Sequence, residues 1–327
     1  MQLNVGILGT GYVAQKRADA LRQDSRVKLK QVSGNSLANT ESFVQKYSLI
    51  PRQNWLDLVS DSELDLIFVS GINRDHEKMV RASLESGKHV VVEYPLALEP
   101  HAALELIALA RSKGLLLHVE HIELLGGVHQ TIKNRIEEIG TVFYARYITI
   151  NPQHQVGTRW TYNHELFGFP LVGALSRIHR FTDLFGIANQ VSCTERYWHE
   201  NNSDLRKYQA CLCRAQIDFS SSLVVEIVYG KGEIFYQPLR NLELHGEKGT
   251  MIFQGEQGIL NKEDTIIALE TPPREGLIAK DTYLVLDYLL TGKPLYIQPE
   301  ESLDSLRIAN ASYQSSTQNS QMVYINP

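Results

Sequence analysis

The sequence has 327 residues, of which 43% are hydrophobic and 21% charged, and its formal net charge is -5. These proportions are those of an ordinary globular protein, and the length suits two domains. The slightly acidic charge and the lack of basic runs give no electrostatic reason to expect a nucleic acid or an anionic membrane surface as a partner.

The amino terminus leads directly into an apolar strand pattern, and no charged region followed by a long apolar segment precedes it, so we expect no signal peptide. No run approaches the roughly 18 apolar residues of a membrane span. The three cysteines are too few for a disulfide framework, and because no paired ligands lie near them we expect them to pack in the core and to bind no metal. We therefore expect a cytoplasmic protein.

The first 122 residues alternate strand and helix patterns. Strands are expected near 5–8, 27–32, 64–70, 89–93 and 115–119. A first helix is expected to follow the first strand and to end near residue 21, and further helices are expected over 38–47, 76–86 and 100–113. Strands that alternate with helices of this length predict a doubly wound parallel sheet. We expect residues 1–122 to form a dinucleotide-binding Rossmann domain.

A glycine motif follows the first strand and opens the first helix, and it reads Gly9-Thr10-Gly11-Tyr12-Val13-Ala14. In a βαβ unit this motif is the dinucleotide fingerprint. Gly9 makes the tight turn, Gly11 lets the backbone approach the pyrophosphate, and Ala14 replaces the third glycine. The amino terminus of the helix then holds the phosphates.

The end of the second strand distinguishes NADPH from NADH. An acidic side chain there would accept hydrogen bonds from the ribose 2′-hydroxyl of NAD, but this sequence has Asn35 and Ser36. A 2′-phosphate would not be repelled, so we expect NADPH as the cofactor and NADH as a less favoured one. No arginine follows Ser36 directly, and Lys16 and Arg17 on the first helix are either phosphate ligands or solvated charges.

Residues 123–327 show a different pattern. A helix is expected over 123–138, and short strands over 142–150, 190–198, 210–219, 223–229, 233–237, 242–245 and 250–254. These predict a C-terminal α+β domain with a large, mainly antiparallel open sheet that binds the substrate. One face of the sheet is expected to pack against helices, and the other to be free for a ligand or for a homodimer contact. The polar tail after Ser312 is expected to fray.

The domain order and several motifs resemble the glucose-fructose oxidoreductase and inositol dehydrogenase (Gfo/Idh/MocA) family. The loop 70–76 matches the one after the family's fourth strand, and the family's Glu-Lys-Pro motif is here Glu93-Tyr94-Pro95. The resemblance implies that Asn73, His76 and Glu93 belong to the cofactor site.

Within that family, the chain is similar to the branch formed by the biliverdin reductases, in particular to their cyanobacterial form. The segments that carry this resemblance are 93–98, 118–125, 126–130, 159–162 and 175–186. The resemblance implies hydride transfer from NADPH to the central methine carbon of biliverdin and protonation of a pyrrole nitrogen, which gives bilirubin.

Tyr94 replaces the lysine that assists removal of a hydroxyl proton in the sugar dehydrogenases of the family. Biliverdin has no alcohol to deprotonate, so an amine is not needed. Tyr94 is therefore interpreted as a residue that donates a hydrogen bond, orients water or packs against the pigment. The alternative is a tyrosine that only seals the nicotinamide pocket.

The acid-base pair of sugar-oxidising members of the family is absent here, and two arginines lie at or beside its positions. Alignment on Asp183 places Ser176 and Arg180 at those positions, with Arg177 alongside. An arginine can bind a propionate with two hydrogen bonds or polarise a lactam oxygen or a bound water. The alternative is that both are solvated or ion-paired, for example Arg180 with Asp183.

Three polar residues follow the strand that ends beside the nicotinamide. Glu120 is interpreted as a proton relay, and His121 and Glu123 as substrate contacts, although each also suits a hydrogen-bonded structural role. Trp160 lies in an aromatic segment, 159–170, that suits a flat π-system or core packing.

Together these residues predict an NADPH-dependent reductase of biliverdin, with Arg177, Tyr94, Arg180 and Glu120 as its catalytic candidates. Two alternatives remain: an NAD(P)-dependent sugar or inositol dehydrogenase, and a non-catalytic bilin- or nucleotide-binding regulator.

Overall fold

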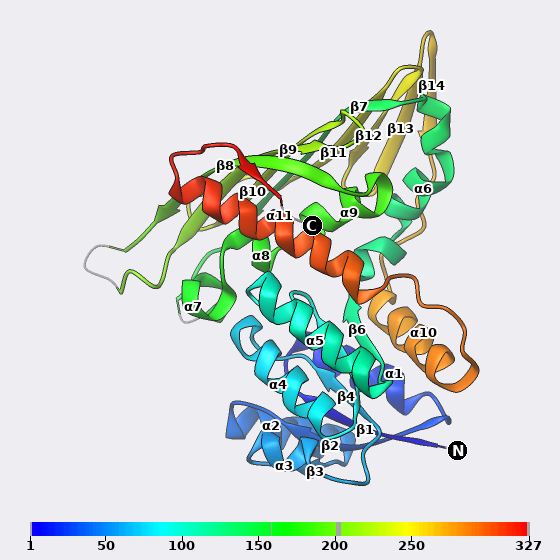
Figure 1. Ribbon diagram of the computed structural model, residues 1–327, viewed down its shortest axis with the longest axis vertical. Coiled ribbons are helices and arrows are strands. Elements are labelled where there is room, and N and C mark those ends of the chain that lie inside the picture. Colours follow the sequence, from blue (N-terminus) through cyan, green and yellow to red (C-terminus); the bar gives the residue numbers. More distant parts are fainter. Residues whose placement is uncertain (1, 158, 201–203, 326–327) are drawn as a thin grey trace. The chain divides into compact units, whose positions relative to one another are not determined.

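A computed structural model describes residues 2–157, 159–200 and 204–325, and the chain forms two compact units (Figure 1). Unit 1 comprises the residues up to Ile122 together with Gly276–Leu303, and unit 2 comprises Glu123–Glu275 and the residues from Asp304 onward. Everything after residue 122 was expected to form one domain, whereas Gly276–Leu303 packs with unit 1. None of the described helices is long and apolar enough to cross a membrane.

Unit 1 contains a six-stranded parallel sheet, which confirms the expected doubly wound fold. Its strands are β1 (Leu3–Leu8), β2 (Val27–Ser33), β3 (Ile50–Pro51), β4 (Leu66–Val69), β5 (His89–Glu93) and β6 (Leu117–Glu120). Its helices are α1 (Tyr12–Arg22), α2 (Leu37–Tyr47), α3 (Trp55–Val59), α4 (Asn73–Glu85), α5 (Pro100–Lys113) and α10 (Leu277–Thr291). β3 and α3 were not predicted, because elements of two and five residues are too short to show a period.

The strand order in unit 1 is β3-β2-β1-β4-β5-β6. The order therefore reverses between β1 and β4, and open parallel sheets bind ligands at the carboxyl ends of the strands on either side of such a reversal. Helix α10 joins this unit because Val285 and Leu286 enter the same core as Val5, Ile7 and Phe68.

Unit 2 contains a nine-stranded sheet in the order β14-β13-β12-β11-β7-β10-β9-β8-β15. Only β10 and β7 pair in parallel, so the expected mainly antiparallel sheet is confirmed. The strands are β7 (Val142–Pro152), β8 (Ala188–Trp198), β9 (Ala210–Phe219), β10 (Val224–Gly232), β11 (Leu239–Gly246), β12 (Gly249–Gln254), β13 (Gln257–Lys262), β14 (Thr265–Leu269) and β15 (Val323–Tyr324).

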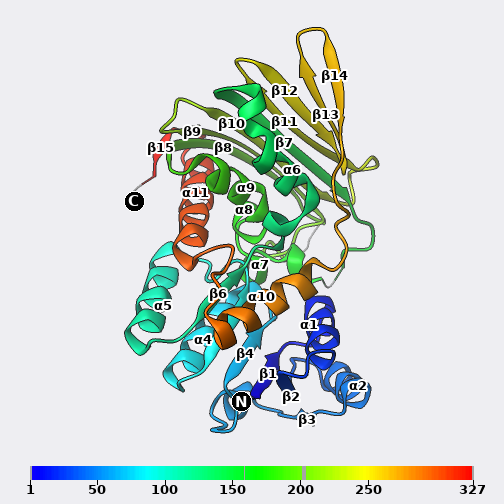
Figure 2. The same ribbon diagram turned by 90° about the vertical axis from the view of Figure 1, so that its right-hand side faces the viewer.

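Helices lie along one face of this sheet, where α6, α9 and α11 are seen in Figure 2. The helical segments are η1 (Ile122–Leu125), α6 (Gly127–Arg135), η2 (Ile136–Ile139), η3 (Trp160–Tyr162), α7 (His164–Phe167), α8 (Pro170–Gly173), α9 (Ser176–Phe185) and α11 (Pro299–Thr317). Val225, Ile227 and Tyr229 of β10 are buried, whereas the alternate residues Val224 and Val228 are only partly buried. We call the face with the buried residues the helix-covered face and the other the open face.

Three local expectations for unit 2 differ from the structure. Residues 233–237 are not a strand, because β10 ends at Gly232, where φ is +119° and a Cβ would lie 2.2 Å from the carbonyl oxygen of Gln209. The described part of the tail, up to residue 325, is ordered instead of frayed: α11 continues to Thr317, and Val323 and Tyr324 pair with β8. The helix expected over 123–138 is divided into η1, α6 and η2.

Candidate functional site

The glycine loop of unit 1 is tied to the loops that follow β2 and β4. The amide of Gly9 donates to the carbonyl of Ser33 at 2.7 Å, and the amide of Ser70 donates to the carbonyl of Leu8 at 2.7 Å. Gly9 has φ +121°, and a Cβ there would lie 2.1 Å from the carbonyl oxygen of Ser70, so only glycine fits.

The amino terminus of α1 is open to a ligand. Gly11 caps this helix without a side-chain hydrogen bond, and a Cβ added to it would meet nothing within 4 Å. Thr10 and Val13 are partly buried beside it, and Tyr12 is 71% exposed. The first amides of a helix have no acceptor within the helix, so this loop suits a pyrophosphate.

The loop after β2 starts at the same edge, because Ser33 pairs with Leu8. Ser36 caps α2 by accepting from the amide of Asn39 at 3.5 Å, and Asn35 is exposed. The first turn of α2 contains no acidic residue. The positive end of this helix and its hydroxyl and amide groups therefore fit a 2′-phosphate.

Arg17 is not a ligand for that phosphate, because it is 1% exposed and belongs to an ion network inside unit 1. Its guanidinium pairs with Glu120 and lies 2.5 Å from a carboxylate oxygen of Asp281. Asp281 also accepts from Tyr296 at 2.6 Å and lies 2.8 Å from Nε2 of His118. Burial acts to raise the pKa of Asp281, but the charge of Arg17 and the contact with His118 hold this pKa well below its usual range. The network fixes Glu120 in one position.

Glu93 and Glu120 end neighbouring strands and are register partners across β5 and β6. Burial and the charge of Glu120 raise the pKa of Glu93 to about 8, although a hydrogen bond from Ser70 acts in the opposite direction. Burial also raises the pKa of Glu120. The pair therefore retains a proton at neutral pH, as two close carboxyl groups in a poorly solvated site do.

Tyr94 follows Glu93 and stacks on His121. The ring centroids are 5.0 Å apart and the ring planes differ by 16°. His121 is fully buried, its Nε2 lies 2.8 Å from the hydroxyl of Ser302, and its amide donates to the hydroxyl of Tyr296. The buried ring of His121 therefore packs against one face of the Tyr94 ring.

Asn73 and His76 lie in the first turn of α4, and both are buried. Nδ1 of His76 lies 2.8 Å from the carbonyl oxygen of Pro95, and its Nε2 lies 3.3 Å from that of Gly71. Burial lowers the pKa of His76. The ring thus connects the loops after β4 and β5.

Arg177 lies on α9 against the helix-covered face of unit 2. Its Nε donates to the hydroxyl of Thr149 at 3.3 Å, and its Nη1 to the hydroxyl of Ser176 at 2.9 Å. The guanidinium carbon lies 4.9 Å from the centroid of the Tyr229 ring. Arg177 therefore lies on the face opposite to the one that was expected to be free for a ligand, because both α9 and the strand residues that it contacts belong to the helix-covered face.

Arg180 is 3% exposed and does not pair with Asp183, which corrects the local ion pair considered from the sequence. Asp183 lies 2.7 Å from Nε2 of His129 and 3.1 Å from the ammonium group of Lys133. Arg180 instead points toward Tyr147, whose ring centroid is 5.7 Å away. One turn of helix separates Arg180 and Asp183, but their side chains face different elements.

Glu123 is the carboxylate that meets Arg180, at 3.9 Å. It also pairs with Arg274 and with Arg240, the latter at 3.3 Å. Burial acts to raise the pKa of Glu123, but the arginines hold this pKa below its usual range. The sequence analysis missed Arg240 and Arg274, because they lie 117 and 151 residues beyond Glu123 and no local pattern links them.

The aromatic segment packs largely on itself. Trp160 lies 5.8 Å from Phe167 between ring centroids and is partly buried. Lys231 is buried among these rings, with its ammonium group 3.7 Å from the Phe167 centroid and 4.6 Å from that of Tyr162. Burial lowers the pKa of Lys231 to about 8. Trp160 is thus held by core packing on one side.

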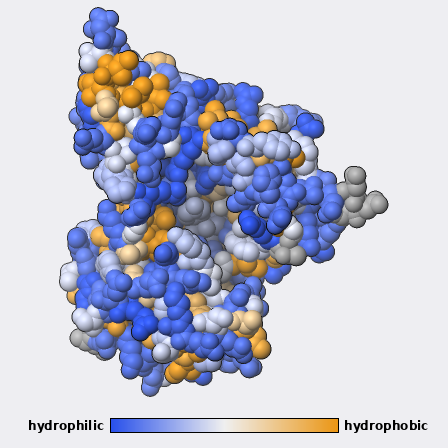
Figure 3. All heavy atoms as spheres, turned by 180° about the vertical axis from the view of Figure 1, so that it is seen from behind, coloured by the Kyte–Doolittle hydropathy of each residue, from blue (hydrophilic) through white to orange (hydrophobic). Residues whose placement is uncertain are grey.

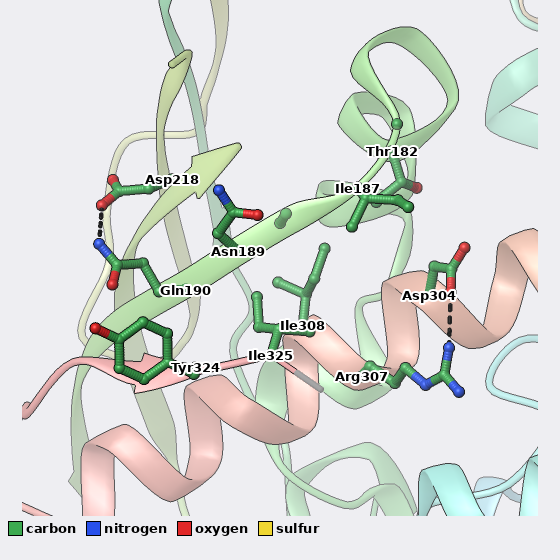
Figure 4. Close-up of a pocket in the computed structure, with 12 residues that line it drawn as sticks. Thr182, Ile187, Asn189, Gln190, Asp218, Asp304, Arg307, Ile308, Tyr324 and Ile325 are labelled. Carbon is green, nitrogen blue, oxygen red and sulfur yellow. Dashed lines mark hydrogen bonds and ion pairs between the residues drawn. The ribbon is translucent and has the colours of Figure 1, made fainter. Parts of the chain in front are cut away.

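Unit 2 contains a hollow of about 740 Å³ that is lined by none of the candidate residues (Figure 4). It lies between the end of α9, β8, β15 and α11. Its polar groups include the pairs Gln190–Asp218 at 2.7 Å and Asp304–Arg307 at 3.0 Å. A hollow with its charges already paired offers little to orient a ligand.

Comparison with known proteins gives a consistent assignment. Residues 3–121 match the "Oxidoreductase family, NAD-binding Rossmann fold", and residues 130–325 match the "Oxidoreductase family, C-terminal alpha/beta domain". A crystal structure of biliverdin reductase from Synechocystis sp. PCC 6803, in complex with biliverdin and NADP+, is similar with a TM-score of 0.94. The two sequences are 50% identical, and the match covers 96% of this chain and 99% of that chain.

Two curated mammalian proteins are similar over shorter regions. Biliverdin reductase A of Homo sapiens is 34% identical over 198 residues, and that of Mus musculus is 35% identical over 138 residues. These regions span 59% and 42% of this chain, and 62% and 44% of the respective relatives. The chain thus matches less than two thirds of each mammalian relative. The two family matches cover most of the chain, which belongs to the Gfo/Idh/MocA oxidoreductase family.

Proposed function

We propose that this protein reduces biliverdin to bilirubin with NADPH, by hydride transfer to the central methine carbon and protonation of a pyrrole nitrogen. The observation that carries this proposal is the 50% identity to the Synechocystis reductase over nearly the whole of both chains. The site supports it, because Ser176 and Arg180, with Arg177 alongside, stand where an alcohol dehydrogenation would need a general base.

The cofactor side of the site is assigned to unit 1. The amino terminus of α1 and the loop from Gly9 to Val13 would hold the pyrophosphate, and Asn35 and Ser36 would receive the 2′-phosphate. Asn73, His76 and Glu93 complete this side. Bound NADPH would supply the hydride.

Proton delivery needs a group that keeps its proton at neutral pH. Arginines are poor donors because their pKa lies above about 12. Glu93, whose pKa is raised to about 8, retains a proton at the carboxyl end of β5, directly before Tyr94. We assign the proton supply to the pair Glu93 and Glu120, with Glu120 fixed by Arg17.

Pigment contacts are assigned within each unit separately. In unit 2, Arg177, Arg180, Glu123 and Trp160 lie on or beside the helix-covered face, and Arg177 is the residue best placed to meet a propionate or a lactam oxygen. In unit 1, the ring of Tyr94, stacked on the buried His121, offers an aromatic surface to a flat tetrapyrrole.

The open face of unit 2 is assigned to contact with a second copy of the chain. Apolar residues gather at the end formed by β12 to β14 (Figure 3), where Ile252 pairs with Ile259 and Ile259 with Ala268. Ile266 on the edge strand is 73% exposed. Light scattering after size-exclusion chromatography should give twice the chain mass, and a single-chain mass at all concentrations would refute this assignment. We also assign the protein to the cytoplasm, since its three cysteines are free and buried.

One assay tests the proposed reaction. Purified protein is mixed with NADPH and biliverdin, and the loss of the biliverdin band and the growth of a bilirubin band are followed together. Binding of biliverdin without turnover would instead indicate a regulator. Oxidation of sugars or inositols with NADP+, without biliverdin reduction, would indicate a dehydrogenase.

A further inference from the structure

A small hollow in unit 2 is surrounded by positive charge at the amino terminus of α6. The residues that define it are Glu123, Gly126, Gly127, Arg180, Arg240 and Arg274. Its volume is about 20 Å³, and a neighbouring hollow of about 10 Å³ is also lined by Arg180 and Arg240. A water needs roughly 10–15 Å³ of such space, so the hollow admits a small group and excludes a ring.

Arg180 brings unsatisfied donors to this hollow. It is 3% exposed, and among the described residues neither its Nε nor its Nη1 has a hydrogen-bond partner. The carboxylate of Glu123 is 3.9 Å away, beyond hydrogen-bond distance. A buried guanidinium with free donors is costly, and an anion placed among those donors would remove that cost.

The helix end adds a second and independent source of donors. Gly126 caps α6 without a side-chain hydrogen bond. Gly127 has no space for a side chain, because a Cβ there would lie 2.0 Å from the carbonyl oxygen of Pro272. The first amides of α6 therefore remain uncovered by any side chain of their own, and such amides attract anions.

The charges around the hollow do not cancel. Three arginines, at positions 180, 240 and 274, face the carboxylates of Glu123 and Glu256, which leaves one positive charge in excess before the helix dipole is counted. His129 adds none in its neutral form, and burial lowers its pKa. Its Nδ1 is a further buried atom without a partner among the described residues.

We propose that this hollow is a site for one oxyanion, bound by Arg180, Arg240 and Arg274 and by the amino terminus of α6. Two sources present the same chemistry: a propionate carboxylate of the tetrapyrrole, and a free inorganic oxyanion such as phosphate. The first source rests on the proposed function, whereas the site itself does not.

Binding of phosphate to the full chain tests the site without any turnover. Isothermal titration is carried out on wild type, Arg240→Gln and Arg146→Gln at constant ionic strength. Arg146 is a matched control, because its side chain is 38% exposed and pairs with Glu243 on the open face, while that of Arg240 is 34% exposed. Loss of one charge-assisted bond should weaken phosphate binding about tenfold or more in Arg240→Gln. Arg146→Gln should stay within about twofold of wild type.

Two further measurements separate the sources. If a propionate occupies the site, phosphate competes with biliverdin, and Arg240→Gln raises KM for biliverdin but not for its dimethyl ester, which lacks the carboxylates. If a free oxyanion occupies it, phosphate binds without competing with biliverdin. Arg240→Gln then changes KM for biliverdin and for its dimethyl ester to the same extent. The proposal is overturned when Arg240→Gln matches Arg146→Gln both in phosphate affinity and in its preference for biliverdin over the ester. Should neither pigment be reduced, the proposed function fails, and phosphate affinity alone decides on the site.

Discussion

Tyr94 stacks on His121 with ring centroids 5.0 Å apart, and His121 is in turn fixed by Ser302 and Tyr296. All four residues belong to unit 1. The residue that replaces the family's lysine is thus part of a layered aromatic support. Such a support orients a ring but does not activate an amine or an alcohol.

Replacement of Tyr94 by Phe should preserve this stack and most of the activity. Because hydride transfer to a methine bridge removes no alcohol proton, we expect kcat for biliverdin to remain within about tenfold of wild type. Tyr94→Leu is the control for the ring itself, and it should lose about 0.5–1.5 kcal/mol of unfolding free energy along with the stacking. A loss of about 10⁴-fold in kcat for Tyr94→Phe would make its hydroxyl the proton donor.

Cofactor preference should respond to one charge at the end of β2. Asn35 is exposed and Ser36 caps α2, so Asn35→Asp adds a carboxylate without disturbing the helix. This carboxylate would repel a 2′-phosphate and accept from a 2′-hydroxyl. Wild type should therefore have the higher kcat/KM with NADPH, and Asn35→Asp should shift the ratio toward NADH. Gln45→Glu, on an exposed position of α2, adds the same charge elsewhere and should leave the ratio unchanged. A wild type that clearly prefers NADH contradicts the assignment.

The stability of the protein without cofactor should fall as pH rises through the range in which Glu93 loses its proton. The pKa of Glu93 is about 8 in the folded chain, whereas its ordinary value is 4.5. Folding thus favours the protonated form, so this contribution is complete below pH about 4.5 and is lost as pH approaches 8. Glu93→Gln stays neutral throughout and should remove this dependence.

Urea unfolding between pH 5 and pH 8 measures that difference. The stability of wild type relative to Glu93→Gln should decrease across this range by an amount on the order of 1–4 kcal/mol. The exposed carboxyl of Glu41, removed as Glu41→Gln, is the control and should leave the wild-type slope intact. Parallel curves for wild type and Glu93→Gln would show that Glu93 titrates normally.

Sequence patterns predicted what depends on neighbours along the chain. The period of 2 in β9 and the helix from Pro100 were placed at their observed bounds, and the glycine motif lies where the fingerprint requires. Residues 276–303 could not be assigned in this way, because α10 joins unit 1 through apolar residues that any core would accept. The division of the helix expected over 123–138 into η1, α6 and η2 was likewise not predictable from the local sequence pattern.

The candidate site was predictable where strand ends meet and unpredictable where distant segments meet. Glu93 and Glu120 both end strands of one parallel sheet, so their proximity follows from the strand pattern, and two close acids imply a raised pKa. The sequence allowed either a proton relay or a hydrogen-bonded structural role for Glu120, and it did not identify the partner Arg17, which lies more than 100 residues away and also pairs with Asp281. Arg240 and Arg274 beside Glu123 were not predicted for the same reason, because they lie far from Glu123 in the sequence.

Arg177 should contribute to catalysis through its guanidinium rather than through its packing. Its donors contact Thr149 and Ser176, and its carbon lies 4.9 Å from the Tyr229 ring, so the group is held in one orientation. Loss of a charge-assisted hydrogen bond to the pigment costs roughly 1.5–3 kcal/mol, or about 10- to 150-fold. Arg177→Ala should lower kcat/KM for biliverdin by that factor, while NADPH affinity, measured by fluorescence titration, stays near wild type.

Arg177→Lys separates this role from a purely structural one. A lysine keeps the positive charge near Tyr229 but cannot copy the planar fork that binds a carboxylate or lactam with two bonds, so it should restore only part of the activity. Arg214→Ala removes an exposed arginine of β9 and should retain the wild-type kcat/KM. Melting temperatures of the three variants show whether any loss arises from unfolding. If Arg177→Ala reduces biliverdin at the wild-type rate, α9 is structural at this position, and the pigment is anchored by other residues of unit 2.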